Sequence, residues 1–227
     1  MTNLSAFVLG ASGTAGKSIV KALVDHPKFD KITLIGRRAL DLSNIAHQPG
    51  YSKIQQKTID FDNVEKYADD FHGYDVGFCA LGTSSVGVNK EQYYRITHDY
   101  VINTAKLAHS GGCKQFHFIS GRSTSKDSWY SWARTKAEVE EKLMAMGFER
   151  VSIYRPGGII KDRTEITSTG ESIGIYAFNI LDPFRCISVD TVVLGKVMVE
   201  SSFRAIESNE ILENADILRL WKEGNKK

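Results

Sequence analysis

The chain has 227 residues, of which 42% are hydrophobic, and this is enough apolar material for one sizeable core. Its 29 Lys and Arg residues and 27 Asp and Glu residues leave a formal net charge of +2, so neither a nucleic acid nor a membrane surface is expected as a partner. No segment reaches the roughly 18 apolar residues of a membrane span. We expect a single cytoplasmic domain over residues 1–227, with a small substrate-side region at about 157–227.

The three cysteines, Cys79, Cys113 and Cys186, lie far apart and show no Cys-x-x-Cys spacing. Neither a disulfide framework nor a metal site is therefore expected. Cys79 lies in an apolar run, which favours a role in core packing.

Short apolar runs alternate with helical patterns along the chain. The runs predict six strands, at Ala6–Leu9, Lys31–Ile35, Ile54–Ile59, Val76–Leu81, Phe116–Ile119 and Val151–Tyr154. Apolar residues at helical spacing predict helices over Thr14–Asp25, around Val64–Phe71, and over a longer segment that ends at Gly111-Gly112. This alternation is typical of an α/β protein with a doubly wound, mostly parallel sheet of the Rossmann type.

The first predicted strand leads directly into a glycine-rich segment. It reads Gly10-Ala11-Ser12-Gly13-Thr14-Ala15-Gly16 and continues into the first predicted helix. In the Gly-x-x-Gly-x-x-Gly pattern the glycines permit a tight turn, a close approach of backbone to pyrophosphate, and close packing of helix on strand. Free N–H groups at the start of the helix then bind the phosphates. The order of strand, glycine loop and helix predicts a dinucleotide site.

The end of the second predicted strand favours NADP(H) as the dinucleotide. An acidic side chain would bind the ribose 2′-hydroxyl of NAD here, but the chain has Arg37 and Arg38, and the first carboxylate after them is Asp41. Two guanidinium groups suit a 2′-phosphate, although solvated surface arginines are the alternative.

The ends of the third and fourth predicted strands supply further candidates. Asp60 and Phe61 are placed to contact the adenine, and Ala80, Leu81, Gly82 and Thr83 to pass close to the adenosine ribose. Caps at the strand ends are the alternative for both groups.

Together these residues resemble those of the atypical short-chain dehydrogenase/reductase superfamily, and within it the oxidoreductase branch of mammalian Tat-interactive protein 2. The similar segments span nearly the whole chain: FVLGASGTAGKSIV, KITLIGRRAL, YDVGFCALGTS, HDYVINTAKLAHSGGCKQFHFIS, TKAEVEEKL, YRPGGII and, more weakly, ILENADILRL. The resemblance implies a Rossmann-like fold, NADP(H) binding and a reductase activity. It further implies that backbone at Pro156 and Gly157 lies beside the nicotinamide, and it leaves the acceptor undefined.

One position departs from the catalytic pattern that the resemblance implies. Active members carry Tyr-x-x-x-Lys, in which the Tyr transfers the proton and the Lys lowers its pKa and binds the nicotinamide ribose. Here Lys136 matches the Lys, but Trp132 stands in the Tyr position. Ser120 matches a strand-end Ser that orients the substrate. Tyr130 could replace the missing acid only if the residues before Trp132 are not helical.

The sequence favours two functions over a third, an epimerase-like or isomerising enzyme, which also normally requires the missing Tyr. One is an NADP(H)-dependent oxidoreductase acting on an unknown small-molecule acceptor, and the other is a redox-silent NADP(H)-binding regulator that acts through a protein partner. The resemblance also implies a homodimer through helices at Glu91–Ser110 and Trp129–Met146. The polar segment Asp162–Glu171 is interpreted either as a lid over the ligand or as an ordinary surface loop.

Overall fold

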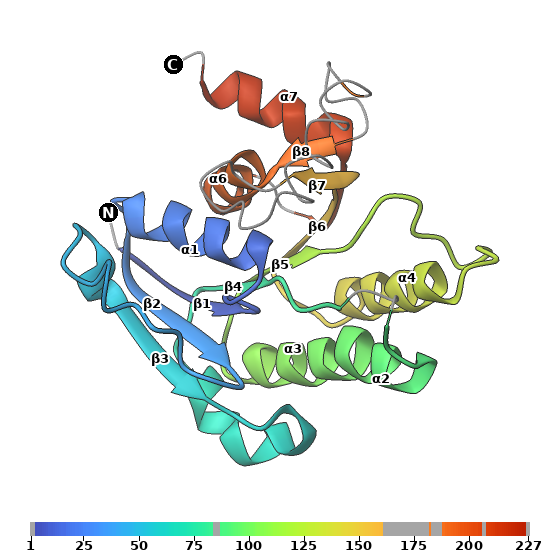
Figure 1. The fold of residues 1–227 in the computed structure, drawn as a ribbon, viewed down its shortest axis with the longest axis horizontal. Coiled ribbons are helices and arrows are strands. Elements are labelled where there is room, and N and C mark those ends of the chain that lie inside the picture. The colour runs from blue at the N-terminus through green and yellow to red at the C-terminus, as the bar shows by residue number, and fades with distance from the viewer. Residues whose placement is uncertain (1–2, 84–86, 161–181, 183–187, 206–207, 226–227) are drawn as a thin grey trace.

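The computed structural model describes residues 3–83, 87–160, 182, 188–205 and 208–225. A seven-stranded parallel sheet forms its centre, in the order β3-β2-β1-β4-β5-β6-β9 (Figure 1). The strands are β1 (Leu4–Leu9), β2 (Phe29–Gly36), β3 (Ile54–Thr58), β4 (Val76–Cys79), β5 (Gln115–Ile119), β6 (Arg150–Arg155) and β9 (Glu210–Glu213). The first six follow the Rossmann order, which confirms the predicted fold class.

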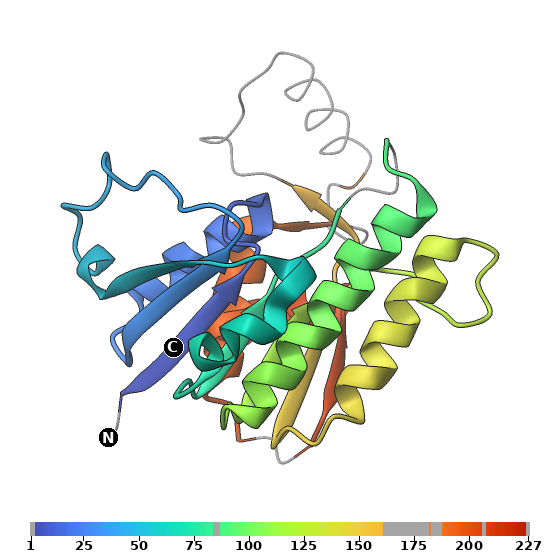
Figure 2. The ribbon, with the colours of Figure 1, turned by 90° about the horizontal axis from the view of Figure 1, so that it is seen from below.

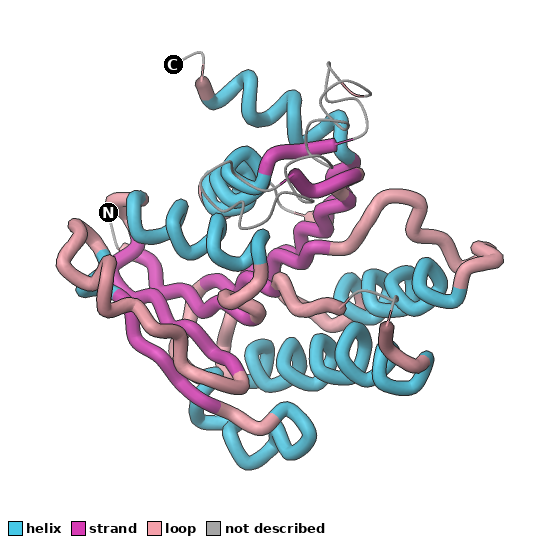
Figure 3. The backbone as a smooth tube through the Cα atoms, viewed as in Figure 1, coloured by secondary structure: helices cyan, strands magenta, loops and turns pink. Residues whose placement is uncertain are grey.

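Helices cover both faces of this sheet (Figure 3). On one face lie α1 (Thr14–Asp25), α6 (Thr191–Ser201) and α7 (Asn214–Gly224). The other face carries η2 (Phe61–Phe71), α3 (Tyr100–Ser110) and α4 (Ser131–Met144), of which α3 and α4 run side by side (Figure 2). The chain enters α3 through α2 (Lys90–Tyr94) and the π-helical turn η3 (Arg95–Asp99).

The alternation of side chains along β1 divides the core into two layers. Ala6 and Val8 pack with α1 and α6, whereas Phe7 and Leu9 pack with η2 and α3. Successive strand residues point to opposite faces, so a strand covered on both faces must be apolar throughout. All four side chains are fully buried. This explains why the central strands could be recognised as continuous apolar runs.

The structure differs from the predicted elements in three ways. The main sheet has a seventh strand, β9, which the six predicted strands do not include. β7 (Gly158–Ile160) and β8 (Ser188–Asp190) form a second, two-stranded parallel sheet. The single helix predicted around Val64–Phe71 is instead a 3-10 segment with non-helical backbone at Asn63 and Tyr67. The predicted loop Asp162–Glu171 and Cys186 lie outside the described residues.

Candidate functional site

The glycine loop connects β1 to α1 at the carboxyl end of the sheet, where β1 and β4 are neighbours. Gly10 has φ +77°, and a Cβ there would lie 2.6 Å from the Ala80 carbonyl oxygen. A Cβ on Gly16 would overlap the Gly10 carbonyl group. These two glycines are therefore required by the protein's own packing. Gly13 differs, because the nearest atom to a Cβ built on it is 3.4 Å away.

The start of α1 is suited to an anion. Gly13 caps the helix without a side-chain hydrogen bond, and the first turn carries no acidic residue. The N–H groups of a first helical turn have no partner within the helix, and they add to the positive end of the helix dipole. The loop can therefore hold phosphate groups in the way that the sequence predicts.

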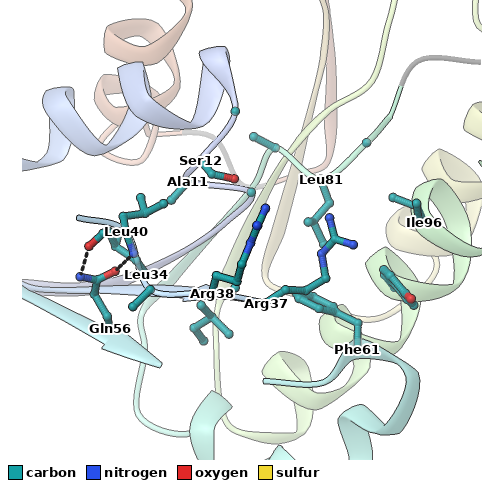
Figure 4. Close-up of a pocket in the computed structure, with 18 of the residues that line it drawn as sticks. Ala11, Ser12, Leu34, Arg37, Arg38, Leu40, Gln56, Phe61, Leu81 and Ile96 are labelled. Carbon is teal, nitrogen blue, oxygen red and sulfur yellow. Dashed lines mark hydrogen bonds between the residues drawn. The ribbon is translucent and has the colours of Figure 1, made fainter. Parts of the chain in front are cut away.

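A pocket of about 420 Å³ opens beside this loop, within the size range of cofactor sites. It is bordered by the carboxyl ends of β1, β2 and β4 and by the helix that follows β4 (Figure 4). Of the predicted cofactor residues, it brings together Gly10, Ala11, Ser12, Gly13, Arg37, Arg38, Phe61, Ala80, Leu81 and Gly82. Thr14, Ala15, Gly16, Asp60, Thr83, Lys136, Pro156 and Gly157 do not line it.

Arg37 and Arg38 are both exposed, and their side chains extend into the pocket. Figure 4 shows Arg38 directed toward Ser12 of the glycine loop and Arg37 directed toward Leu81. Neither guanidinium group has a hydrogen bond or an ion pair with any other residue that the structure describes. Two unpaired cations beside an anion-binding loop fit a phosphorylated ligand.

The loop that carries these arginines is held by Gln56 of β3. Its side-chain oxygen accepts a hydrogen bond from the Leu40 N–H at 2.7 Å, and its side-chain nitrogen donates to the Leu40 carbonyl at 3.0 Å (Figure 4). Asp41 also borders the pocket, but it accepts a hydrogen bond from the backbone N–H of Ser43 within its own turn. Hydrogen bonds from Ser43 lower the pKa of the Asp41 carboxyl.

The start of η2, which follows β3, meets the start of α3 on the opposite side of the pocket. Asp60 does not face the pocket, because its carboxylate accepts hydrogen bonds from the Asp62 N–H and the Asn63 side chain and so caps η2. Phe61 does line the pocket, and its ring lies 5.1 Å from that of Tyr100. The Tyr100 hydroxyl donates to Asp62 at 2.7 Å. Asp60 thus caps the start of η2, whereas Phe61 and Tyr100 form an aromatic wall of the pocket.

The predicted catalytic residues converge at the carboxyl end of β5. The Lys136 ammonium group donates a hydrogen bond to the Ser120 carbonyl at 2.7 Å. Burial lowers the pKa of Lys136, and the carboxylate of Glu140 opposes that shift. The Ser120 hydroxyl lies 3.3 Å from the Thr124 hydroxyl, which donates to the Gly121 carbonyl at 2.7 Å. Lys136 and Ser120 are thus brought together, with Thr124 as an additional hydroxyl.

Trp132 lies one turn before Lys136 on α4 and is half-buried. Tyr130 precedes the helix with an extended backbone and is 66% exposed. Its ring stacks on that of Trp132, with centroids 6.0 Å apart. The helix therefore begins at Ser131, Tyr130 itself is not helical, and its ring lies against the indole near the surface.

Backbone at the end of β6 joins this region. The Pro156 carbonyl accepts a hydrogen bond from the Arg122 N–H at 2.9 Å, and the Gly157 N–H donates to the Asn214 side chain at 3.0 Å. Arg155 forms ion pairs with Glu140 of α4 and Glu213 of β9. These contacts tie β6 to α4 and α7 beside Lys136.

Comparison with known proteins identifies the family. A family model described as NAD(P)H-binding matches residues 10–174, which include the glycine loop, the arginine pair and Lys136. The chain belongs to the NAD(P)H-binding family. Protein HTATIP2 of Rattus norvegicus is 37% identical over 99% of this chain and 92% of the rat protein. Membership of the atypical short-chain dehydrogenase/reductase type, with a resemblance to HTATIP2, is thereby confirmed.

Fungal relatives of this chain correct one expectation. The protein fmp52-1 of Aspergillus terreus is 27% identical over 96% of this chain and 99% of its own length. FMP52 of Candida albicans is 27% identical over 89% of this chain and 90% of its own. Both carry the word mitochondrial in their names, which points away from a plain cytoplasmic location. The cytoplasmic expectation drawn from composition is therefore wrong.

Solved structures of similar fold are NAD-binding enzymes and related proteins. MoeE5, in complex with UDP-glucuronic acid and NAD, superposes with a TM-score of 0.67 at 13% identity, covering 92% of this chain and 75% of MoeE5. A putative NAD-dependent epimerase/dehydratase from Bacillus halodurans superposes with a TM-score of 0.66 at 15% identity, covering 92% of this chain and 93% of that protein. At such identities the likeness establishes the Rossmann-like fold alone.

The part of the chain that the structure describes contains neither a metal-binding cluster nor a membrane-spanning helix. No three His, Cys, Asp or Glu side chains there are arranged to hold a metal ion. No helix among the described residues is both long and apolar enough to cross a membrane.

Several residues that line the pocket beside the glycine loop are not among those that the sequence predicts. They are Leu34, Ile35, Gly36, Ala39, Leu40, Asp41, Gln56, Ile96 and Tyr100. Those at the end of β2 flank the predicted arginines and could have been included on position alone. Ile96 and Tyr100 lie four residues apart on the helix after β4. Residues at this spacing share one helix face, so both could have been predicted to line the same pocket. Gln56 had no such signal, because its role depends on the pairing of β2 with β3.

Proposed function

We propose that this member of the NAD(P)H-binding family is an NADP(H)-dependent oxidoreductase that transfers a hydride to a small-molecule acceptor. The observation that carries the choice of NADP(H) is the pair Arg37 and Arg38, which enter the pocket without an ion-pair partner among the described residues. A carboxylate in this place would repel a 2′-phosphate, whereas a guanidinium forms charge-assisted hydrogen bonds with it.

The chain's own residues suggest how the cofactor would be held. Glycine-loop N–H groups bind the pyrophosphate, Arg37 and Arg38 bind the 2′-phosphate, and Phe61 and Tyr100 flank the adenine. Lys136 of α4 would bind the nicotinamide ribose, held in place by its hydrogen bond to the Ser120 carbonyl at the end of β5. When bound, the reduced nicotinamide supplies the hydride. On the acceptor side, the Asn214 side chain would hold Ser188 against the end of β6, since it accepts a hydrogen bond from the Gly157 N–H and donates one to the Ser188 carbonyl.

Fluorescence titration with NADPH and NADH tests this assignment. We expect NADPH to bind at least about tenfold more tightly, a difference of about 1.4 kcal/mol. Arg37→Ala and Arg38→Ala should reduce this preference, and together they should nearly abolish it. Arg219→Ala is the matched control, because Arg219 is exposed on α7 and pairs with Asp216. Equal affinities of the wild type for NADPH and NADH would contradict the choice of cofactor.

A second candidate function follows from Trp132. An indole N–H can donate a hydrogen bond but is no proton donor at neutral pH, so the proton-transfer role has no side chain at this position. We infer that, if no acceptor is reduced, the protein is a redox-silent NADP(H)-binding regulator acting through a protein partner.

Trp132→Tyr separates the two functions. If the site is built for carbonyl reduction, restoring the phenol beside Lys136 should raise turnover of simple aldehydes and ketones by about 10²–10⁴. Trp221→Tyr on α7 is the matched control and should leave the turnover of these aldehydes and ketones unchanged. A Trp132→Tyr variant that folds, binds NADPH and still leaves every acceptor untouched would favour the regulator.

A further inference from the structure

Three aromatic residues crowd the segment that leads into α4. Trp129 is 94% exposed, Tyr130 is 66% exposed, and Trp132 is half-buried beneath the Tyr130 ring. We call these three residues the aromatic rim. Large aromatic side chains at such exposure carry an unfavourable contact with water, and a contiguous group of them commonly marks a binding surface.

The backbone beneath the aromatic rim is well anchored. The Arg134 guanidinium donates hydrogen bonds to the carbonyls of Ser128 and Trp129 at 2.6 and 2.9 Å. The Tyr130 carbonyl accepts from the N–H groups of Ala133 and Arg134, and the Tyr130 N–H donates to the Ser128 hydroxyl. The aromatic rings are therefore presented from a fixed main chain, which lowers the entropy lost when a ligand binds them.

The aromatic rim adjoins the proposed hydride-transfer site. Residues four apart on a helix share a face, so Trp132 lies on the same face of α4 as Lys136. Lys136 in turn is bonded to Ser120 at the end of β5. The stacked rings of Tyr130 and Trp132 therefore lie one helical turn from Lys136 along α4.

We propose that the aromatic rim binds a planar conjugated acceptor of the quinone class by ring stacking on Trp132 and Tyr130. This inference rests on the proposed oxidoreductase function and names its acceptor. The quinone takes a hydride from NADPH at one carbonyl oxygen and so gains two electrons and one hydrogen. The other oxygen, left as a phenolate, takes a proton from water. NADP⁺ and a hydroquinone are the products.

The chemistry of a quinone matches the missing proton donor. Reduction of an ordinary ketone places charge on an alkoxide, which needs an acid beside it in the transition state. Reduction of a quinone places charge on a phenolate-type oxygen, whose pKa of about 10 lets water supply the proton later. The presence of Trp132 in place of a tyrosine should therefore slow quinone reduction little. Its indole also provides the flat apolar surface on which a conjugated ring stacks.

NADPH oxidation with a matched pair of acceptors tests the proposal. Tetramethyl-1,4-benzoquinone is planar, conjugated and blocked against addition of thiols, and cyclohexane-1,4-dione has the same carbonyl spacing in a saturated ring. We expect turnover of the quinone and at least tenfold lower kcat/KM with the dione. Trp132→Leu and Tyr130→Leu should each raise the quinone KM by about three- to tenfold and leave NADPH affinity unchanged. Trp221→Leu should leave the quinone KM unchanged.

Calorimetric binding of the quinone to the NADP⁺-loaded protein separates this inference from the function on which it rests. If the dione is reduced as well as the quinone, or if both rim variants keep the wild-type quinone KM, the aromatic rim is not the acceptor site, although the oxidoreductase function stands. A second outcome is that the quinone binds and that this binding weakens in both rim variants, while no acceptor oxidises NADPH. In that case binding of the ring to the aromatic rim stands, but the oxidoreductase function fails. Absence of quinone binding overturns the inference.

Discussion

At the scale of single residues, Gly13 gives the cleanest test of the phosphate cradle. A Cβ on Gly13 would meet no atom closer than 3.4 Å, so the fold itself leaves room for a methyl group. A bound pyrophosphate would approach the backbone at this second glycine of the loop. We predict that Gly13→Ala weakens NADPH binding at least tenfold by fluorescence titration.

The stability of the Gly13→Ala variant shows whether weaker NADPH binding comes from lost contact with the phosphates or from disturbed packing of the protein. Replacing an N-cap glycine by alanine should cost no more than about 1 kcal/mol in urea denaturation. A variant that is much less stable would show that packing, and not the ligand, requires this glycine. Unchanged NADPH affinity in a stable variant would argue against phosphate binding by the loop.

His117 is a buried titratable residue remote from the proposed chemistry. It is fully buried in β5, with Nδ1 3.0 Å from the Tyr154 hydroxyl, as expected for a satisfied core histidine. Burial, followed by the positive charges of Arg150 and Arg204, lowers its pKa from 6.5 to about 3. The folded protein therefore keeps His117 neutral at pH values where the unfolded chain is protonated.

This shift predicts a loss of stability in acid. Between pH 6.5 and about 3 the unfolded state binds one more proton at His117 than the native state, so the free energy of unfolding falls as pH falls. The full slope from this residue is about 1.4 kcal/mol per pH unit. Urea denaturation from pH 7 to 4.5 should show a shallower slope in His117→Gln than in wild type. The exposed-residue control His47→Gln should keep the wild-type slope, and parallel curves for all three proteins would refute the prediction.

At the scale of elements, α1 and α6 pack closely against each other. A Cβ on Gly195 of α6 would lie 2.6 Å from the backbone carbonyl carbon and oxygen of Ser18 in α1. Backbone cannot yield as a flexible side chain can, so the helices must separate. We predict that Gly195→Ala lowers the free energy of unfolding by about 1–3 kcal/mol in urea denaturation.

Gly224 at the end of α7 is the matched control. A Cβ there would meet nothing within 4 Å. Alanine has the higher helix propensity, so Gly224→Ala should be neutral or stabilising by less than about 1 kcal/mol. Similar effects of the two substitutions would mean that helix propensity, and not interhelical contact, governs both positions.

The elements differed in how far local sequence could predict them. Central strands such as β1 were recognisable because burial on both faces demands an unbroken apolar run. The β9 strand was missed because it is short and carries Glu210 and Glu213 at its ends. Its charges are paired with Arg150 and Arg155 from the neighbouring strand, and such pairing is visible only in the folded chain.

At the scale of the whole molecule, cofactor binding should stabilise the fold. A ligand present at one hundred times its Kd raises the free energy of unfolding by about 2.7 kcal/mol. For a chain of this size that corresponds to a rise in Tm of about 5–10 °C. NADH at the same concentration, if it binds tenfold more weakly, should raise Tm by about half as much. Differential scanning fluorimetry measures both shifts, and equal shifts would argue against a role for the arginine pair in cofactor choice.

The sequence by itself determined the features that depend on neighbouring residues. Strand, glycine loop and helix follow one another directly, the arginines follow β2, and Trp132 stands four residues before Lys136. Only the tertiary structure decided the features that join distant segments. Gln56 clamps a loop 16 residues away, and Lys136 reaches Ser120 across the same separation. The physical reason is that spacing specifies a local backbone, whereas a pocket forms from side chains that only the packed sheet brings within bonding distance.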